Sequence, residues 1–312
     1  MNDAVWVVTL AAAVSAGTPL ALAATGEILA ERSGVLNLGV EGMMLLGAVV
    51  SFLATHAAGN SWLGLLAGMA AGGGLAAVHA FLSVTMRANQ IVSGLALVIF
   101  GTGLATFLGK PVEGQPLGSR IEAIRIPGLA EIPILGRILF EQDPLVYLSW
   151  LVVGLAAFYM VRTRAGLALR ACGESPATAD AMGLSVARIR YAHVIVGGLL
   201  AGAGGAYQVL VRVPAWNGAG TTAGIGWIAL ALVVFAAWRP WRALAGAYLF
   251  GAALAANFAL QATGVRVVPA EFLAMLPYLL TILVLVVLSA SSTRKRLGAP
   301  AALGVPYVRE ER

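Results

Sequence analysis

The chain has 312 residues, of which 60% are apolar and only 11% charged, and its formal net charge is +6. Soluble domains carry roughly a quarter charged residues, because polar side chains must cover their surface. This composition excludes a soluble globular protein and indicates that lipid surrounds most of the chain. The basic excess does not indicate nucleic-acid binding, because the basic residues lie in short patches between apolar runs and lack interleaved aromatic residues.

Apolar runs long enough to cross a bilayer, which takes about 20 residues in a helix, recur along the chain. We predict an all-α, polytopic transmembrane bundle of about nine spans, with roughly eight to ten as the range. The expected spans are 4–24, 39–58, 62–84, 90–109, 144–161, 191–211, 224–238, 243–262 and 272–290. The first is expected to be a retained span, because the residues before it include Asp3 and no basic residue, unlike a signal peptide. The seventh is short and follows Gly220, Gly224 and Gly226, which predicts a broken helix.

The basic residues predict the orientation of the chain. With the C-terminus inside, fourteen of the 20 Lys and Arg lie on the cytoplasmic side, against six outside, four of which share one long loop at 110–143. We therefore place the C-terminus in the cytoplasm and, with nine spans, the N-terminus outside. Residues 1–293 are expected to form one transmembrane domain, with an internal loop at 162–190, followed by a basic cytoplasmic tail at 294–312. The external loop is expected to be an ordered cap or docking surface, and a passive linker is the alternative.

Several kinds of chemistry are not expected in this chain. Its single cysteine, Cys172, has no Cys or His neighbour at metal-ligand spacing. Neither lysine ends a glycine-rich phosphate-binding loop, because Pro111 and Arg296 follow them. We therefore expect no metal, no cofactor and no enzymatic activity. Glycines four apart, at Gly68 and Gly72 and at Gly198 and Gly202, are instead expected to let membrane helices pack closely.

The predicted internal loop carries the signals of a short helix. Ser175 is a suitable N-cap, and Pro176 suits the first turn because its missing N–H would be unpaired there. Gly183 suits the left-handed position after a helix, so we predict a helix of about two turns at 176–182. Ser185 is then placed to cap the next helix. Such a short helix, rigidly joined to a membrane span, fits a groove on a cytoplasmic partner, and the alternative is an ordinary solvated loop.

Three segments carry a family resemblance. Residues 170–183, RACGESPATADAMG, resemble the coupling loop of the permeases that serve ribose-type and branched-chain amino acid ABC importers. Residues 31–42, ERSGVLNLGVEG, are similar to the motif at the start of the second span in the nucleoside-importing branch, and 224–231 resembles its later counterpart. The resemblance implies the shorter permease subunit of a bacterial inner-membrane importer. It implies a second, different permease, cytoplasmic ATPase subunits that bind the ATP, and an extracytoplasmic substrate-binding protein as partners.

The resemblance also implies a cargo and a set of coupling residues. The cargo would be a small polar solute, with a nucleoside favoured and riboflavin, a sugar or an amino acid as alternatives. The residues expected to couple the ATPase to transport are Gly173, Glu174, Ser175, Pro176, Ala179, Asp180 and Gly183.

Polar side chains at membrane depth are costly unless they are paired or face water, so they mark candidate pathway positions. Glu41 lies about one turn inside the second span, and Arg32, a water-filled cavity or amides of a helix broken at Gly39 and Gly42 could compensate its charge. It is either a pathway or gating residue or a helix-end carboxylate near headgroups. The candidate pathway residues are Asn37, Glu41, Asn89, Gln90, Gln208, Trp227 and Asn257, although amides also bridge helices for structural reasons.

Alternative interpretations remain open for three aromatic residues and for the class of the protein. Tyr207, Trp216 and Trp227 are expected at the membrane interface, with stacking on a nucleobase as the alternative. A stand-alone ion-coupled transporter that uses Glu41 and Glu271 is the main rival to the importer. A membrane-embedded enzyme is a third class, but no convergent acid, base or nucleophile supports it.

Overall fold

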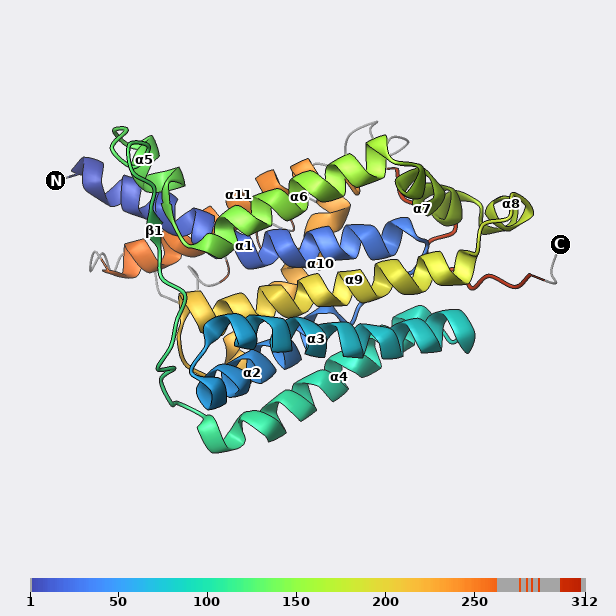
Figure 1. The fold of residues 1–312 in the computed structure, drawn as a ribbon, viewed down its shortest axis with the longest axis horizontal. Helices are drawn as coiled ribbons and strands as arrows, with labels where there is room; N and C mark the ends of the chain where they lie inside the picture. The colour runs from blue at the N-terminus through green and yellow to red at the C-terminus, as the bar shows by residue number, and fades with distance from the viewer. Residues whose placement is uncertain are drawn as a thin grey trace.

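The computed structural model describes residues 2–262 and 298–309 and the single positions 275, 279, 282 and 286, with side chains from residue 6 to 256 in the first range. The long helices run side by side along one axis (Figure 1). The chain start and α5 lie at one end of this bundle, and α7, α8 and the C-terminal segment lie at the other. We call these the α5 end and the α8 end.

The elements follow one another as mostly antiparallel helices. The first half contains α1 (Asn2–Arg32), α2 (Val40–Ala58), α3 (Ser61–Ala80), the π-helical turn η1 (Phe81–Thr85), α4 (Gln90–Gly109) and η2 (Lys110–Val112). The connection and the next helices are β1 (Ile124–Arg125), α5 (Leu135–Leu139), β2 (Glu141–Gln142), α6 (Pro144–Arg162), α7 (Arg164–Glu174) and α8 (Pro176–Ala181). The last described elements are α9 (Val186–Tyr207), the π-helical turn η3 (Gln208–Arg212), η4 (Gly218–Thr221), α10 (Ile225–Phe235) and α11 (Pro240–Ala262).

Within the described residues, 7 helical segments are long and apolar enough to cross a membrane. They are Trp6–Arg32, Val40–Ala58, Ser61–Thr85, Gln90–Val112, Pro144–Arg162, Val186–Arg212 and Gly218–Phe235. These correspond to the first seven predicted spans, so the helical bundle is confirmed. Helix α11 covers the eighth predicted span, whereas 272–290 lies outside the described residues, so the count of nine stays a prediction.

The first helix is longer than predicted, because it continues to Arg32 through two acidic residues. Both are buried and accept hydrogen bonds: Glu27 Oε1 from the Asn37 amide at 3.1 Å, and Glu31 Oε2 from the indole N–H of Trp238. Partners that arrive from elsewhere in the fold offset the cost of burying these carboxylates. Residues 33–39 then form a loop that is buried at most of its positions.

Glycines let the backbones of α2, α3 and α9 touch. A Cβ added at Gly72 would overlap the carbonyl oxygen of Gly198, and one at Gly202 would overlap that of Gly68. The two predicted pairs therefore pack against each other, as expected for helices that associate without a hydrophobic driving force. The same close approach joins Gly47 on α2 to Gly202.

The segment between α4 and α6 is ordered. Strands β1 and β2 pair antiparallel, and the amides of Leu117 and Ile121 donate to the carbonyls of Pro214 and Leu210 at 2.8 and 3.0 Å. These bonds fix the segment 110–143 on the turn that follows α9, so an ordered cap describes it better than a passive linker. Its placement outside the cell stays a prediction.

Candidate functional site

Helix α8 begins as the sequence predicts. Ser175 is its N-cap, and Ser175 Oγ accepts from the Thr178 amide at 3.4 Å and lies 2.7 Å from Thr178 Oγ1. Pro176 occupies the first turn, where its missing N–H leaves no donor unpaired. Local side-chain chemistry therefore sets the start of this helix.

The end of α8 also follows the prediction, one residue earlier than expected. The helix stops at Ala181, and Gly183 adopts the left-handed conformation with φ of +82°. The Gly183 amide donates to Asp180 O at 2.9 Å and the Leu184 amide to Ala179 O at 3.1 Å, which closes the helix end. Ser185 stands at the N-cap of α9 but its side chain makes no capping bond, so that part of the expectation is wrong.

Helix α8 has a buried base and an exposed outer face. The base is a small apolar cluster of Cys172, Ala179 and Val186, against which the half-buried Leu184 packs. Burial raises the pKa of the Cys172 thiol, and the nearby Arg190 opposes this shift. On the outer face, Met182 is 78% exposed at the tip of the bundle.

Exposure decides which apolar residues of this segment a partner could contact. Ala177, Ala181 and Met182 are exposed, whereas Leu184 faces the base. Ala179 is 2% exposed, so it supports the helix and cannot contact another protein directly.

Helix α7, which precedes α8, was not predicted from the sequence. Thr163 caps it, with its Oγ1 accepting from the Gly166 amide at 2.9 Å. A Cβ at Gly173 would overlap the carbonyl oxygen of Arg32, so α7 rests directly on the end of α1. The predicted coupling residue Gly173 is thus a packing residue, and the signal available in the sequence for α7 was Thr163, a favourable N-cap residue.

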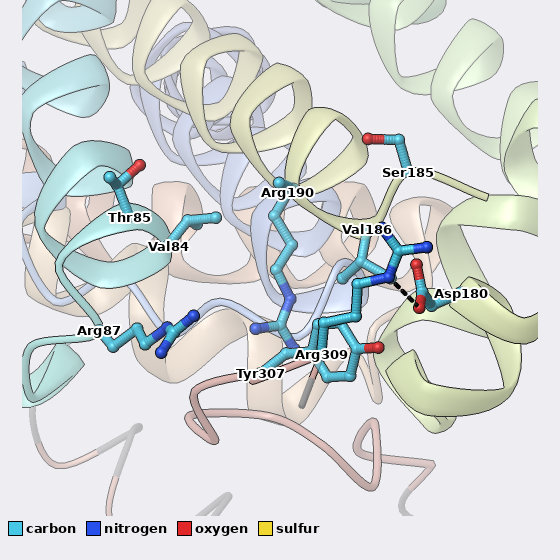
Figure 2. Close-up of a pocket in the computed structure, with 10 residues that line it drawn as sticks. Val84, Thr85, Arg87, Asp180, Ser185, Val186, Arg190, Tyr307 and Arg309 are labelled. Atoms are coloured by element: carbon cyan, nitrogen blue, oxygen red, sulfur yellow. Dashed lines mark ion pairs between the residues drawn. The ribbon is translucent and has the colours of Figure 1, made fainter. Parts of the chain in front are cut away.

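The C-terminal segment packs against the base of α8. Tyr307 joins the apolar base, and Arg309 Nε lies 3.2 Å from Asp180 Oδ2 (Figure 2). Arg190, which is 1% exposed, donates to Val305 O and Ser33 O, both at 3.2 Å. The described part of the predicted basic tail, residues 298–309, packs on the bundle in this way, and we call it the strap. A cavity of about 390 Å³ lies between the strap, α8, the start of α9 and the turn at Arg87.

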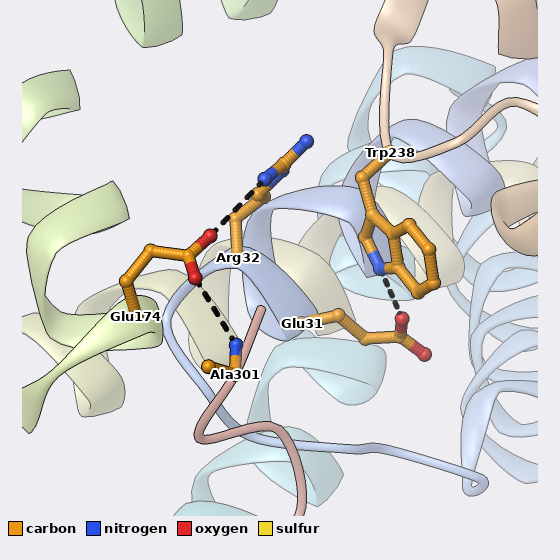
Figure 3. A network of polar contacts seen from close by, with 5 residues as sticks. All are labelled: Glu31, Arg32, Glu174, Trp238 and Ala301. Carbon is orange, nitrogen blue, oxygen red and sulfur yellow. Dashed lines mark hydrogen bonds and ion pairs between the residues drawn. The ribbon is translucent and has the colours of Figure 1, made fainter. Parts of the chain in front are cut away.

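Glu174 links the same strap to α1. Its Oε2 accepts from the Ala301 amide at 3.2 Å, and its Oε1 lies 3.9 Å from Arg32 Nη1 (Figure 3). The Ala302 amide donates to Gly173 O at 2.9 Å and adds a second attachment. The predicted coupling residues are thus brought together at the α8 end, and they join three separate parts of the chain.

Glu41, in the first turn of α2, holds the start of the broken helix α10. Its Oε1 accepts from Thr222 Oγ1 at 2.5 Å and the Gly224 amide at 3.2 Å, and its Oε2 accepts from the Gly226 amide at 2.7 Å. Gly224 has φ of +82°, and α10 begins directly after it. A carboxylate at a helix N-terminus satisfies free amides and interacts favourably with the helix dipole.

This geometry decides between the partners considered for Glu41. The amides come from a broken helix, as one alternative held, but the break precedes α10 and does not lie at Gly39 and Gly42. Arg32 pairs with Glu174 instead. The predicted interruption of the seventh span is confirmed by η4, the turn at Gly224 and the short α10.

Three predicted pathway amides make structural hydrogen bonds. Asn37 Oδ1 accepts from the Gly39 amide at 2.9 Å, and Gln90 Oε1 accepts from the Leu36 amide at 2.8 Å, so both fix the buried 33–39 loop. Asn89 caps α4. These bonds account for the three residues without cargo, and their part in a pathway stays a prediction.

The remaining candidates differ in accessibility. Gln208 is buried in the η3 turn, Trp227 is exposed on α10, and the side chain of Asn257 lies outside the described residues. Tyr207 and Trp216 are fully buried, which contradicts both the interface and the stacking readings. Glu271, named for the ion-coupled alternative, also lies outside the described residues.

Comparison with known proteins gives a consistent family. The model of the family described as branched-chain amino acid transport system permease component matches residues 9–285. The chain is 42% identical to a putative glucose ABC transporter permease of Haloferax volcanii, over 96% of this chain and 97% of the relative. It is 37% identical to a guanosine ABC transporter permease of Bacillus subtilis and 36% identical to a nucleoside ABC transporter permease of Lactococcus lactis, each over 94% of both chains. No solved structure matches the chain significantly.

Proposed function

Because the chain belongs to the family of branched-chain amino acid transport system permease components, we propose that it forms the translocation pathway of a bacterial ABC importer, with a nucleoside as cargo. The bundle of apolar helices and the relatives named as ABC transporter permeases support the membrane-spanning role. The partners of the proposal are cytoplasmic ATPase subunits, a second permease and an extracytoplasmic binding protein.

The proposed mechanism rests on how α8 is packed: one side is buried and the other is exposed. Its base is buried against Cys172 of α7, Val186 of α9 and Tyr307 of the strap, while Met182 projects from the tip. A short, supported helix with an exposed apolar side chain suits insertion into a groove of another protein. We assign this groove to the ATPase subunit, which puts the α8 end and the C-terminus in the cytoplasm.

A nucleoside is favoured over other cargos by two relatives that carry guanosine and nucleoside in their names. The similarity of residues 31–42 to the nucleoside branch points the same way. Glucose is the second candidate, because the relative named for glucose is 42% identical.

Two substitutions at the α8 end test the assignment of α8 to the groove of the ATPase subunit. In the assembled transporter in proteoliposomes, Met182→Asp is expected to abolish copurification of the ATPase subunit and ATP-driven uptake. Val305→Asp is the matched control, because Val305 is an exposed apolar residue at the same end but lies on the strap. Equal loss in both variants, or uphill uptake by the isolated chain, would refute the proposal.

The cargo is tested separately by competition. Uptake of labelled guanosine should fall when unlabelled nucleosides are added and stay unchanged with glucose. Inhibition by glucose alone would assign the chain to sugar transport and would not affect the assignment of α8 to the ATPase subunit.

A further inference from the structure

An arginine-rich cavity lies on the side of the bundle near the α8 end, apart from the outer face of α8. It has a volume of about 580 Å³ and lies where α1, α6 and α7 meet the turn between α10 and α11. Arg32, Arg170, Arg239 and Arg242 line it, together with Trp238 and Trp241.

The positive charge of this cavity exceeds what the nearby protein neutralises. Among the residues that the structure describes, the four arginines make one ion pair, between Arg32 Nη1 and Glu174 Oε1 at 3.9 Å. The Nε atoms of Arg32 and Arg170 are buried and have no hydrogen-bond partner within the same part of the chain. Buried guanidinium groups are stable when an anion accepts their N–H groups, so the cavity is suited to an anion.

The turn between α10 and α11 forms part of the cavity wall. Ala237 and Trp238 both have left-handed backbones, with φ of +50° and +55°, which is unfavourable for residues with a side chain. This turn places the Trp238 indole on Glu31 and Arg239 directly before the first turn of α11. The N-terminal end of that long helix adds partial positive charge near the arginines.

An exposed apolar track leads to the cavity along α6. Leu151, Leu155, Phe158 and Val161 are all more than half exposed and recur at helical spacing, and Val161 also lines the cavity. The ring of the exposed Trp241 lies beside Gly154 on the same helix. Tryptophan and arginine beside a lipid-facing track are typical of the membrane interface.

We propose that this cavity binds the phosphate headgroup of an anionic phospholipid, with an acyl chain lying along the apolar track of α6. Arginine recognises phosphate through paired N–H groups, and basic pockets between membrane helices suit anionic headgroups. A free phosphate would use the arginines but leave the track on α6 without a role. The site is independent of cargo and of the outer face of α8.

The test measures lipid binding to the full chain by native mass spectrometry in detergent, with phosphatidylglycerol and phosphatidylcholine as probes. The variant Arg239→Gln/Arg242→Gln removes two exposed arginines of the cavity. The matched control Arg162→Gln/Arg164→Gln removes two exposed arginines at the same end that do not line it. The cavity variant is expected to bind phosphatidylglycerol on the order of twenty-five-fold more weakly, since each arginine near an anionic surface contributes about a factor of five.

Each other outcome overturns the assignment. An equal loss in the control would show general surface attraction, and an unchanged affinity in both variants would show that the cavity binds no lipid. Inorganic phosphate that displaces phosphatidylglycerol at equal concentration would indicate a free-anion site. Copurification of the ATPase subunit with the assembled transporter is measured in parallel, and a cavity variant that keeps the lipid but loses this subunit would make the cavity a protein-docking site. Because transport is not measured, the result does not depend on the proposed cargo.

Discussion

Replacing Glu41 by glutamine should loosen the start of α10 without changing the shape of the side chain. The carboxylate accepts three hydrogen bonds, from Thr222 Oγ1, the Gly224 amide and the Gly226 amide, and it is 8% exposed. A glutamine amide has one accepting oxygen and one donating NH₂ group. Whichever way it is oriented, its NH₂ group faces at least one backbone N–H of the first turn.

The magnitude follows from this donor-to-donor contact. A buried donor left without a partner costs about 1–3 kcal/mol, and loss of the charge at the helix N-terminus adds about 0.3–1 kcal/mol. We therefore expect local opening of α10 to become easier by about 2 kcal/mol, which is roughly a thirty-fold change in an opening equilibrium. Thr222→Val, which removes one of the three donors and keeps the shape, should have a smaller effect.

Hydrogen exchange of residues 224–228 provides the assay. The amides of this turn should exchange roughly thirty-fold faster in Glu41→Gln, while amides in the middle of α9 keep their rates. Glu131→Gln is the control, because Glu131 is exposed in the loop between α4 and α6. Unchanged exchange at Gly226 would refute the claim that Glu41 anchors α10.

Three further changes test the α8 end. Gly183→Ala should lower the free energy of unfolding by about 1–2 kcal/mol in thermal or denaturant melts, since the added Cβ meets nothing within 4 Å and the cost is conformational; an Asn there should cost less. Tyr307→Ala should speed maleimide labelling of Cys172, because Tyr307 packs on the cluster that contains this thiol. The raised pKa of Cys172 keeps the thiolate scarce, so labelling of the wild type should increase as the pH rises. Equal labelling rates in the two proteins would show that the strap does not cover Cys172. Asp180→Asn should change stability by less than about 1 kcal/mol, because its partner Arg309 is 76% exposed, and a larger change that persists in high salt would contradict this.

The features predicted well from the sequence are those that local chemistry decides. Ser175, Pro176 and Gly183 act within one short helix, so their spacing alone predicts α8. The first seven spans follow from the length of apolar runs. The interruption before α10 follows from glycines that favour a turn.

The features that the sequence did not reveal depend on partners far along the chain. Glu41 meets Gly226 across 185 residues, and nothing near Glu41 indicates which amides it will accept. The end of α1 was misplaced because hydropathy treats Glu27 and Glu31 as a boundary, whereas Asn37 and Trp238 satisfy them inside the fold. Likewise Tyr207 is buried because its hydroxyl donates to Asp143 Oδ2 at 2.7 Å, a contact that no window of sequence contains.

Close backbone contacts link the α8 end to the interrupted seventh span. Helices α2, α3 and α9 touch through glycine backbones, and such contacts do not deform without large overlap, so we expect these helices to move as one unit. The start of α10 is fixed to the same unit in two ways, because the Glu41 carboxylate accepts from the Gly226 amide and a Cβ added at Gly226 would overlap the Glu41 backbone. Helix α9 starts a few residues after α8, so a displacement of α8 acts directly on this unit. We therefore infer that such a displacement moves the start of α10 together with α2, α3 and α9.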